Sequence, residues 1–278
     1  MGVVCAIEGR EVSRGIVAER ASERAFFGIS ALIFVASAAV TIGLSASMRL
    51  MGEMPMPGGW TLSMVWMWMP GQSWPGAAAS FAGMWIVMMV AMMLPSLAPM
   101  LSRYRQSVRK AGETRVGCLT ATAGTAYFFV WSVLGMAAYA LGIALTAIEM
   151  QRPSLAHAVP VAVGVVVLIA GALQFSAWKA HHLTCCRKAL ERSRALAPNV
   201  GTAWRHGLRL GLHCIFCSAG LTAILLVSGI MNLRVMAVVT AAITFERLAP
   251  AGERVARAIG AVVLGAGLFM IARAAGLG

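Results

Sequence analysis

The stretch Trp204–Asn232, WRHGLRLGLHCIFCSAGLTAILLVSGIMN, governs how the rest of the chain is interpreted. Most of it is apolar, and it is long enough to cross a bilayer as a helix, which takes about 20 residues. Within it stand His213, Cys214 and Cys217, a Cys-x-x-Cys pair directly preceded by a histidine. Thiols and an imidazole at helical spacing in an apolar run are typical of a soft-metal site or a redox pair.

A second cluster of the same chemistry lies about thirty residues upstream, in Lys179-Ala-His181-His182-Leu-Thr-Cys185-Cys186. On helices, His182 and Cys186 are four residues apart and share a face, as do His213 and Cys217. Two such faces can close on one ion. The sequence therefore predicts a mixed nitrogen and sulfur metal site with these ligands: His182, Cys185, Cys186, His213, Cys214 and Cys217.

The composition excludes an ordinary soluble domain. Hydrophobic residues make up 59% of the 278 residues and charged residues 12%, which predicts an all-α, polytopic transmembrane helical bundle. The net charge of +13 is attributed to basic loops on one membrane side and to anionic lipid, and not to nucleic-acid binding. The expected surroundings are a lipid bilayer, and we expect a bacterial inner membrane.

Apolar runs predict about seven spans, or six if the short run 233–245 does not cross. They cover residues 26–46, 79–101, 118–148, 159–178, 207–231, 233–245 and 258–272. The distribution of Arg and Lys places the N-terminus in the cytoplasm. The predicted organisation is a cytoplasmic N-terminal segment (1–25) and a single transmembrane domain (26–278), with a Met/Trp-rich outer loop (47–78) and a cytoplasmic loop (179–206).

Methionine is abundant and clustered, with nineteen residues, and all ten acidic residues are Glu. In the second span, two neighbouring helical stripes are formed by Met84, Met88 and Met92 and by Met89 and Met93. Thioethers favour soft ions, Cu(I) first. The stripes and the outer loop are thus read as a relay for Cu(I), with core packing and an interfacial aromatic belt as the alternatives.

Two charged residues are expected to support the ligands. Lys179 flanks the upstream cluster, where a positive charge favours the thiolate that binds metal. Glu246 is the acid nearest to this level, and it is expected to be a partner of a ligating histidine. Pairing of Glu246 with Arg247 or Arg209 is the alternative.

Several motifs in order resemble a known family. They are Met88-Met89-Val-Ala-Met92-Met93-Leu-Pro95, Gln174 through Lys179 to Cys186-Arg187, Gly211-Leu-His213-Cys214-x-x-Cys217, Gly229-Ile-Met231-Asn232 and Glu246-Arg247-Leu-Ala-Pro250. The chain from about Ala79 to its end resembles the predicted metal-binding integral membrane proteins, a bacterial family catalogued as a domain of unknown function. The resemblance implies an inner-membrane helical bundle with a metal role. Many members have Cys where this chain has His182 and Ser218.

Three functions are compatible with the sequence. The first is binding of Cu(I), with zinc as the alternative ion, and its movement or delivery through the methionines to the His/Cys site near the cytoplasmic side. Such a protein is compatible with a soluble metal donor or acceptor and with a homo-oligomer, and it is not expected to be an enzyme. The second is a membrane thiol-disulfide oxidoreductase that uses Cys214 and Cys217 with a quinone. The third is a structural or partner-binding membrane subunit.

Overall fold

The chain folds almost entirely into helices in a computed structural model, which describes residues 2–50, 54–56, 60–62, 73–192 and 199–275. The helices are α1 (Gly2–Leu50), α2 (Trp74–Lys110), α3 (Val116–Gln151), α4 (Pro153–Leu173), α5 (Ala177–Arg192), α6 (Val200–Val227), α7 (Leu233–Leu248) and α8 (Gly252–Ala274). A small antiparallel hairpin of β1 (Met54–Met56) and β2 (Trp60–Leu62) follows α1. The predicted all-α class is confirmed.

Side-chain caps fix where the central helices begin. The Asn199 side chain accepts a hydrogen bond from the Thr202 amide, and the Thr202 hydroxyl accepts one from the Asn199 amide, which makes a capping box for α6. Asn232 accepts from the amides of Arg234 and Val235 at the start of α7. These caps satisfy amides that have no partner inside the helix, so the breaks before α6 and α7 are encoded locally.

Long apolar helices indicate insertion into a membrane. Five helices are long and apolar enough to span, and α4 with α5 forms a sixth candidate that is bent by 66° at its break. The run predicted over 233–245 is α7, whose 16 residues fall below the length required of these candidates. The helices of the described part of the chain thus support the lower of the two predicted counts, six.

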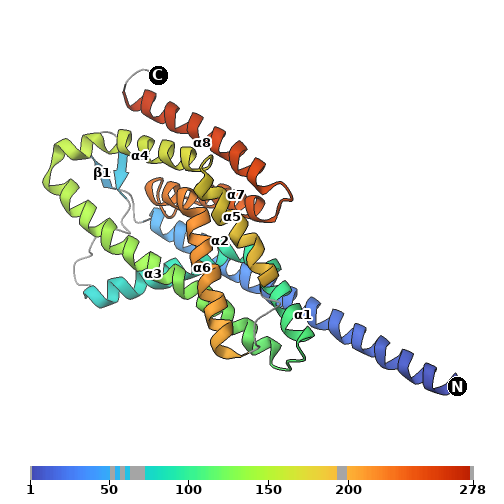
Figure 1. Ribbon diagram of the computed structural model, residues 1–278. Coiled ribbons are helices and arrows are strands. Elements are labelled where there is room, and N and C mark those ends of the chain that lie inside the picture. The colour runs from blue at the N-terminus through green and yellow to red at the C-terminus, as the bar shows by residue number, and fades with distance from the viewer. Residues whose placement is uncertain (1, 51–53, 57–59, 63–72, 193–198, 276–278) are drawn as a thin grey trace.

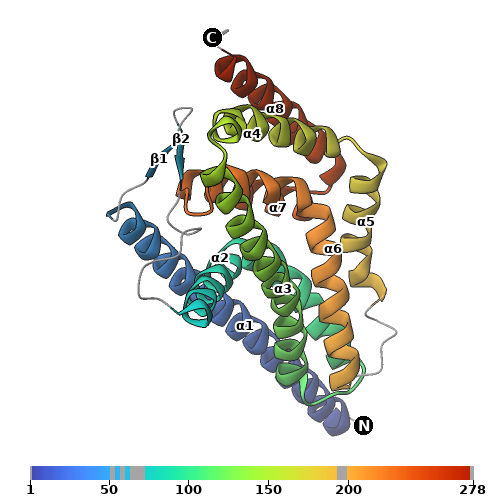
Figure 2. The same cartoon turned by 90° about the vertical axis from the view of Figure 1, so that its left-hand side faces the viewer.

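The helices pack into a bundle (Figures 1 and 2), and the N-terminal part of α1 projects from it in the view of Figure 1. α3 packs against both α2 and α6, and α4 runs beside α8. Contact between α3 and α6 is close because Gly207 lies directly on the Ala123 carbonyl, and a Cβ at Gly211 would lie 3.1 Å from the Tyr127 carbonyl oxygen. Small residues that allow close backbone approach are typical of helix pairs in membranes, and here they bring Tyr127 of α3 up to α6.

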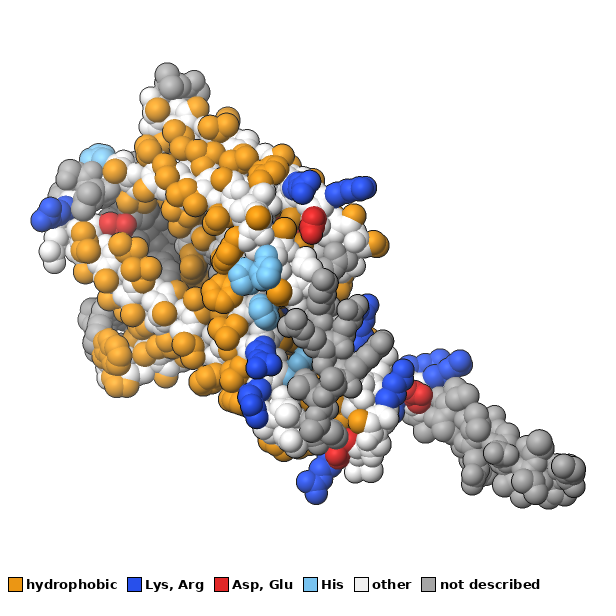
Figure 3. All heavy atoms as spheres, viewed as in Figure 1, with side chains coloured by type: hydrophobic (Ala, Val, Ile, Leu, Met, Phe, Trp, Pro, Cys, Tyr) orange, Lys and Arg blue, Asp and Glu red, His pale blue; other side chains and the backbone are white. Residues whose placement is uncertain are grey.

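The outside of the bundle is apolar where lipid is expected. Hydrophobic side chains cover much of the face seen in Figure 3, and basic side chains lie at its edges and below the histidine group. Leu32 of α1 and Val262 of α8 are among the most exposed large apolar residues of the described chain. Exposed apolar side chains on this scale are normal for a surface that faces acyl chains and unusual for one that faces water.

Two segments differ from the sequence-based expectation in their local structure. Residues 179–206, predicted as a loop, are mostly helical, because α5 continues to Arg192 and α6 already begins at Val200. The span predicted over 79–101 belongs to the longer helix α2, which contains Pro95 and Pro99 and continues to Lys110. The methionines of the predicted outer capture loop between positions 51 and 69 have side chains outside the described structure.

Candidate metal centre

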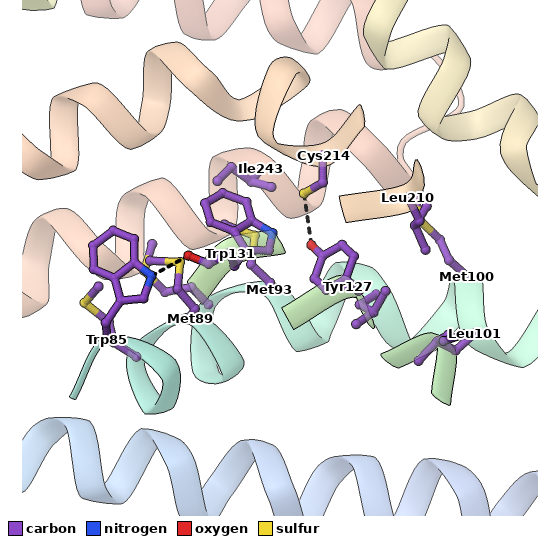
Figure 4. Packing of buried hydrophobic residues seen from close by; sticks show 14 of the residues in the cluster. Trp85, Met89, Met93, Met100, Leu101, Tyr127, Trp131, Leu210, Cys214 and Ile243 are labelled. Carbon is purple, nitrogen blue, oxygen red and sulfur yellow. Dashed lines mark hydrogen bonds between the residues drawn. The ribbon is translucent and has the colours of Figure 1, made fainter. Parts of the chain in front are cut away.

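Three cysteines from two helices form a buried thiol cluster, defined here as Cys186 of α5 with Cys214 and Cys217 of α6. All three side chains are almost completely buried. The Cys186 and Cys217 sulfur atoms are 3.6 Å apart. The Tyr127 hydroxyl donates to the Cys214 sulfur at 2.9 Å, and this contact from α3 is visible in Figure 4. The Cys-x-x-Cys pair is therefore extended by a third thiol from the upstream cluster.

A buried guanidinium faces the thiol cluster from α7. Arg247 donates through Nη1 to the Cys214 sulfur at 3.2 Å and to the Ser96 hydroxyl at 2.8 Å. Its Nη2 donates to the Met100 sulfur at 3.1 Å. Among the described residues no carboxylate forms an ion pair with Arg247. The guanidinium instead lies against the Cys214 sulfur, and a cation beside a thiol favours its thiolate form.

A buried ion pair lies on the other side of the thiol cluster, near α5 and the break before it. The Lys179 ammonium donates to the Cys217 carbonyl oxygen and pairs with Glu246 Oε2 at 2.7 Å. Gln174, at the break between α4 and α5, donates to Glu246 Oε1 at 3.0 Å. Both residues predicted to support the ligands, Lys179 and Glu246, thus lie at the site. They form an ion pair with each other, and Glu246 also accepts a hydrogen bond from Gln174.

The imidazoles lie beside the thiol cluster in more exposed positions. The ring centres of His182 in α5 and His213 in α6 are 5.9 Å apart. His181 is exposed, and its Nε2 lies 3.5 Å from the Cys185 sulfur. Trp178 and Phe216 contact the His182 ring. The nitrogen-bearing residues and Cys185 therefore form a separate, outer group at the α5–α6 surface.

Both predicted methionine stripes belong to α2 and are buried in the core of the helix bundle. Met88, Met89, Met92 and Met93 are at most 2% exposed, and they pack in one hydrophobic cluster with Trp85, Trp131 and Tyr127 (Figure 4). The stripe of Met84, Met88 and Met92 continues at four-residue steps to Ser96 and Met100, the two α2 residues that Arg247 contacts. One end of the stripe thus reaches the thiol cluster.

The thiol cluster fits a soft cation in its donor chemistry. Two sulfur atoms 3.6 Å apart can both reach one ion at a metal–sulfur distance of about 2.3 Å. The part of the chain that the structure describes contains no set of three or more His, Cys or Glu side chains already placed around a common ion position. The six predicted ligands are instead divided between the buried thiols and the outer imidazole group, and their role as ligands remains a prediction.

Three residues of the site were missed by sequence reasoning: Met100, Tyr127 and Arg247. Met100 had a usable signal, because it extends the Met84–Met88–Met92 spacing by two further turns. Arg247 had a weaker one, an arginine at the end of an apolar run and next to an acid. Tyr127 had none, since its position depends on the close packing of α3 on α6.

A comparison with protein families gives an independent assignment. The family model described as "PpoB2: Copper chaperone" matches residues 82–270, which is more than half of the chain and contains all the site residues described above. Neither the curated proteins nor the solved structures include a match. The earlier resemblance to metal-binding membrane proteins is thereby confirmed as far as a copper-related family. On the evidence of this match, the chain belongs to the PpoB2 family of copper chaperones.

Proposed function

We propose that the protein is a membrane copper chaperone that binds Cu(I) at the thiol cluster and passes it to an acceptor protein. The observation that carries the proposal is the Cys186–Cys217 contact, in which two buried sulfurs from different helices lie 3.6 Å apart. Cys214 and the Met100 thioether are the further sulfur donors around Arg247. Soft sulfur donors of this kind favour Cu(I).

The charge of Arg247 supports a thiolate-bound monovalent ion. Copper binding replaces thiol protons, and Cu(I) held by two thiolates carries one net negative charge. A guanidinium in contact with the cluster balances that charge where water cannot. Zn²⁺ with the same two thiolates is neutral and leaves the arginine uncompensated, so copper is favoured over the alternative ion zinc.

The buried methionines supply a route to this site. Met84, Met88 and Met92 lie on the α2 face that ends at Met100, and Met89 and Met93 lie beside them in the same core. We propose that Cu(I) is relayed along these thioethers from the outer side of a bacterial inner membrane. Thioethers bind Cu(I) more weakly than thiolates, so the ion ends at the thiol cluster.

The oxidoreductase alternative uses the same thiols without metal. A redox pair was expected to consist of Cys214 and Cys217, and the structure adds a third thiol, Cys186, whose sulfur lies 3.6 Å from that of Cys217. Membership of a copper-chaperone family favours metal binding over redox catalysis. We therefore propose no enzymatic activity for the chain.

The test is a Cu(I) affinity measurement on the purified protein under anaerobic, reducing conditions. A chromogenic Cu(I) chelator competes with the wild type, with the Cys214→Ser/Cys217→Ser variant and with Cys118→Ser, which removes an exposed thiol of α3. We expect one tightly bound Cu(I) per chain in the wild type and in Cys118→Ser, and its loss in the double variant. Full affinity in the double variant would refute the proposed site.

A further inference from the structure

The outer imidazole pair, His182 and His213, repeats the arrangement of the inner thiols. Each pair takes one residue from α5 and one from α6. His182 is four residues before Cys186, and His213 is four residues before Cys217. A spacing of four residues keeps each imidazole on the same helix face as its thiol. The α5–α6 contact therefore carries two levels of metal-binding side chains, a buried one of sulfur and a half-exposed one of nitrogen.

The geometry of the imidazole pair suits a shared ion. With a metal–nitrogen bond of about 2.1 Å and each nitrogen about 1.15 Å from its ring centre, two rings in line across one ion have centres about 6.5 Å apart, and a bent arrangement brings them closer. The observed separation is 5.9 Å. In addition, His182 Nδ1 is buried and has no hydrogen-bond partner in the described structure, although a buried nitrogen normally has one.

Aromatic and imidazole rings surround the pair at the surface. Trp178 packs edge-on against His182 at 4.8 Å between ring centres, and Phe216 lies 5.0 Å from the same ring. His181 lies on the outer side of His182 at 5.4 Å. Histidine side chains are visible as a group on the face shown in Figure 3. An ion at this level is thus within reach of a docked protein, whereas the thiols are buried.

We propose that His182 and His213 form an exchange port, a second and transient Cu(I) site through which the ion passes between the thiol cluster and an acceptor protein. This inference rests on the proposed function of the thiol cluster. Imidazole holds Cu(I) less tightly than thiolate does, so the port governs how fast copper enters and leaves while the thiols govern how tightly it is held.

The experiment separates rate from affinity. Cu(I) is offered as a coloured complex of a bidentate chelator, and its transfer to the protein and back is followed by stopped-flow absorbance. The proteins are the wild type, His182→Asn/His213→Asn, and the control His157→Asn, which changes an exposed histidine of α4. We expect transfer in both directions to slow about tenfold, a barrier change of about 1.4 kcal/mol, with the equilibrium affinity unchanged within about twofold.

Each other result is decisive. Equal losses of rate and affinity would make the imidazoles ligands of the thiol site itself and overturn a separate port. An unchanged rate would make them ordinary surface residues. If the double variant loses helicity, the single variants His182→Asn and His213→Asn give the same readout. Failure of the proposed function itself is distinguishable, because wild-type protein would then take no copper from the chelator.

Discussion

Buried sulfur occurs in two regions of this molecule that differ in their surroundings. The methionine stripes of α2, such as Met88 and Met89, lie among aromatic and aliphatic side chains. The thiol cluster lies among three buried charged side chains, Lys179, Glu246 and Arg247. Buried charges are costly in a membrane and are rarely retained without a role. The difference favours the thiol cluster as the proposed ion site, whereas core packing already accounts for much of what surrounds the methionines.

The largest expected effect comes from breaking the buried ion pair beside the thiols. Lys179→Met leaves the Glu246 carboxylate buried without its cation, which we expect to lower the free energy of unfolding by about 3–5 kcal/mol. Chemical denaturation in detergent, followed by helicity, measures the change. The double variant Lys179→Met/Glu246→Gln removes both charges and is expected to recover part of the loss. Equal stability of Lys179→Met and wild type would show that the pair is not buried as described.

The next effect concerns the arginine that faces the sulfurs. Arg247→Gln removes the charge that balances a Cu(I)–thiolate complex, and we expect the affinity for Cu(I) to fall about 100-fold. The affinity for Zn²⁺ is expected to fall less, because its two-thiolate complex is neutral. Competition titrations with both ions measure the ratio of the Cu(I) affinity to the Zn²⁺ affinity. Arg254→Gln, a change of an exposed arginine in α8, is the control, and an unchanged ratio in Arg247→Gln would remove the charge argument.

The smallest effect is expected in the methionine region. Met88→Leu/Met92→Leu nearly conserves volume, so the unfolding free energy should change by less than about 1.5 kcal/mol per site, and the equilibrium affinity for Cu(I) should stay the same. If these thioethers relay the ion, loading of reconstituted vesicles from the outer side becomes slower. Unchanged loading would assign the stripes to packing alone and would sharpen the contrast with the thiols.

The sequence was sufficient for the helical class and for the approximate position of every spanning helix, because run length and hydropathy are local properties. It also placed Cys186, Cys214 and Cys217 in one site from their helical spacing. Residue spacing shows which side chains share a helix face but not how deeply each is buried. It therefore could not predict that the thiols are buried while the imidazoles lie nearer the surface. Tyr127 and Arg247 depend on how α3 and α7 pack on α6, which no local pattern encodes.

The central claim is that the thiol cluster holds the copper. Copper K-edge X-ray absorption on the loaded wild-type protein tests it most directly, because it reports both the oxidation state and the ligand atoms. The account predicts a Cu(I) edge and a first coordination sphere of sulfur alone, with bonds of about 2.3 Å, taking the zinc–sulfur value as a guide. A coordination sphere of nitrogen and oxygen alone would contradict it and would move the site to the outer imidazole pair.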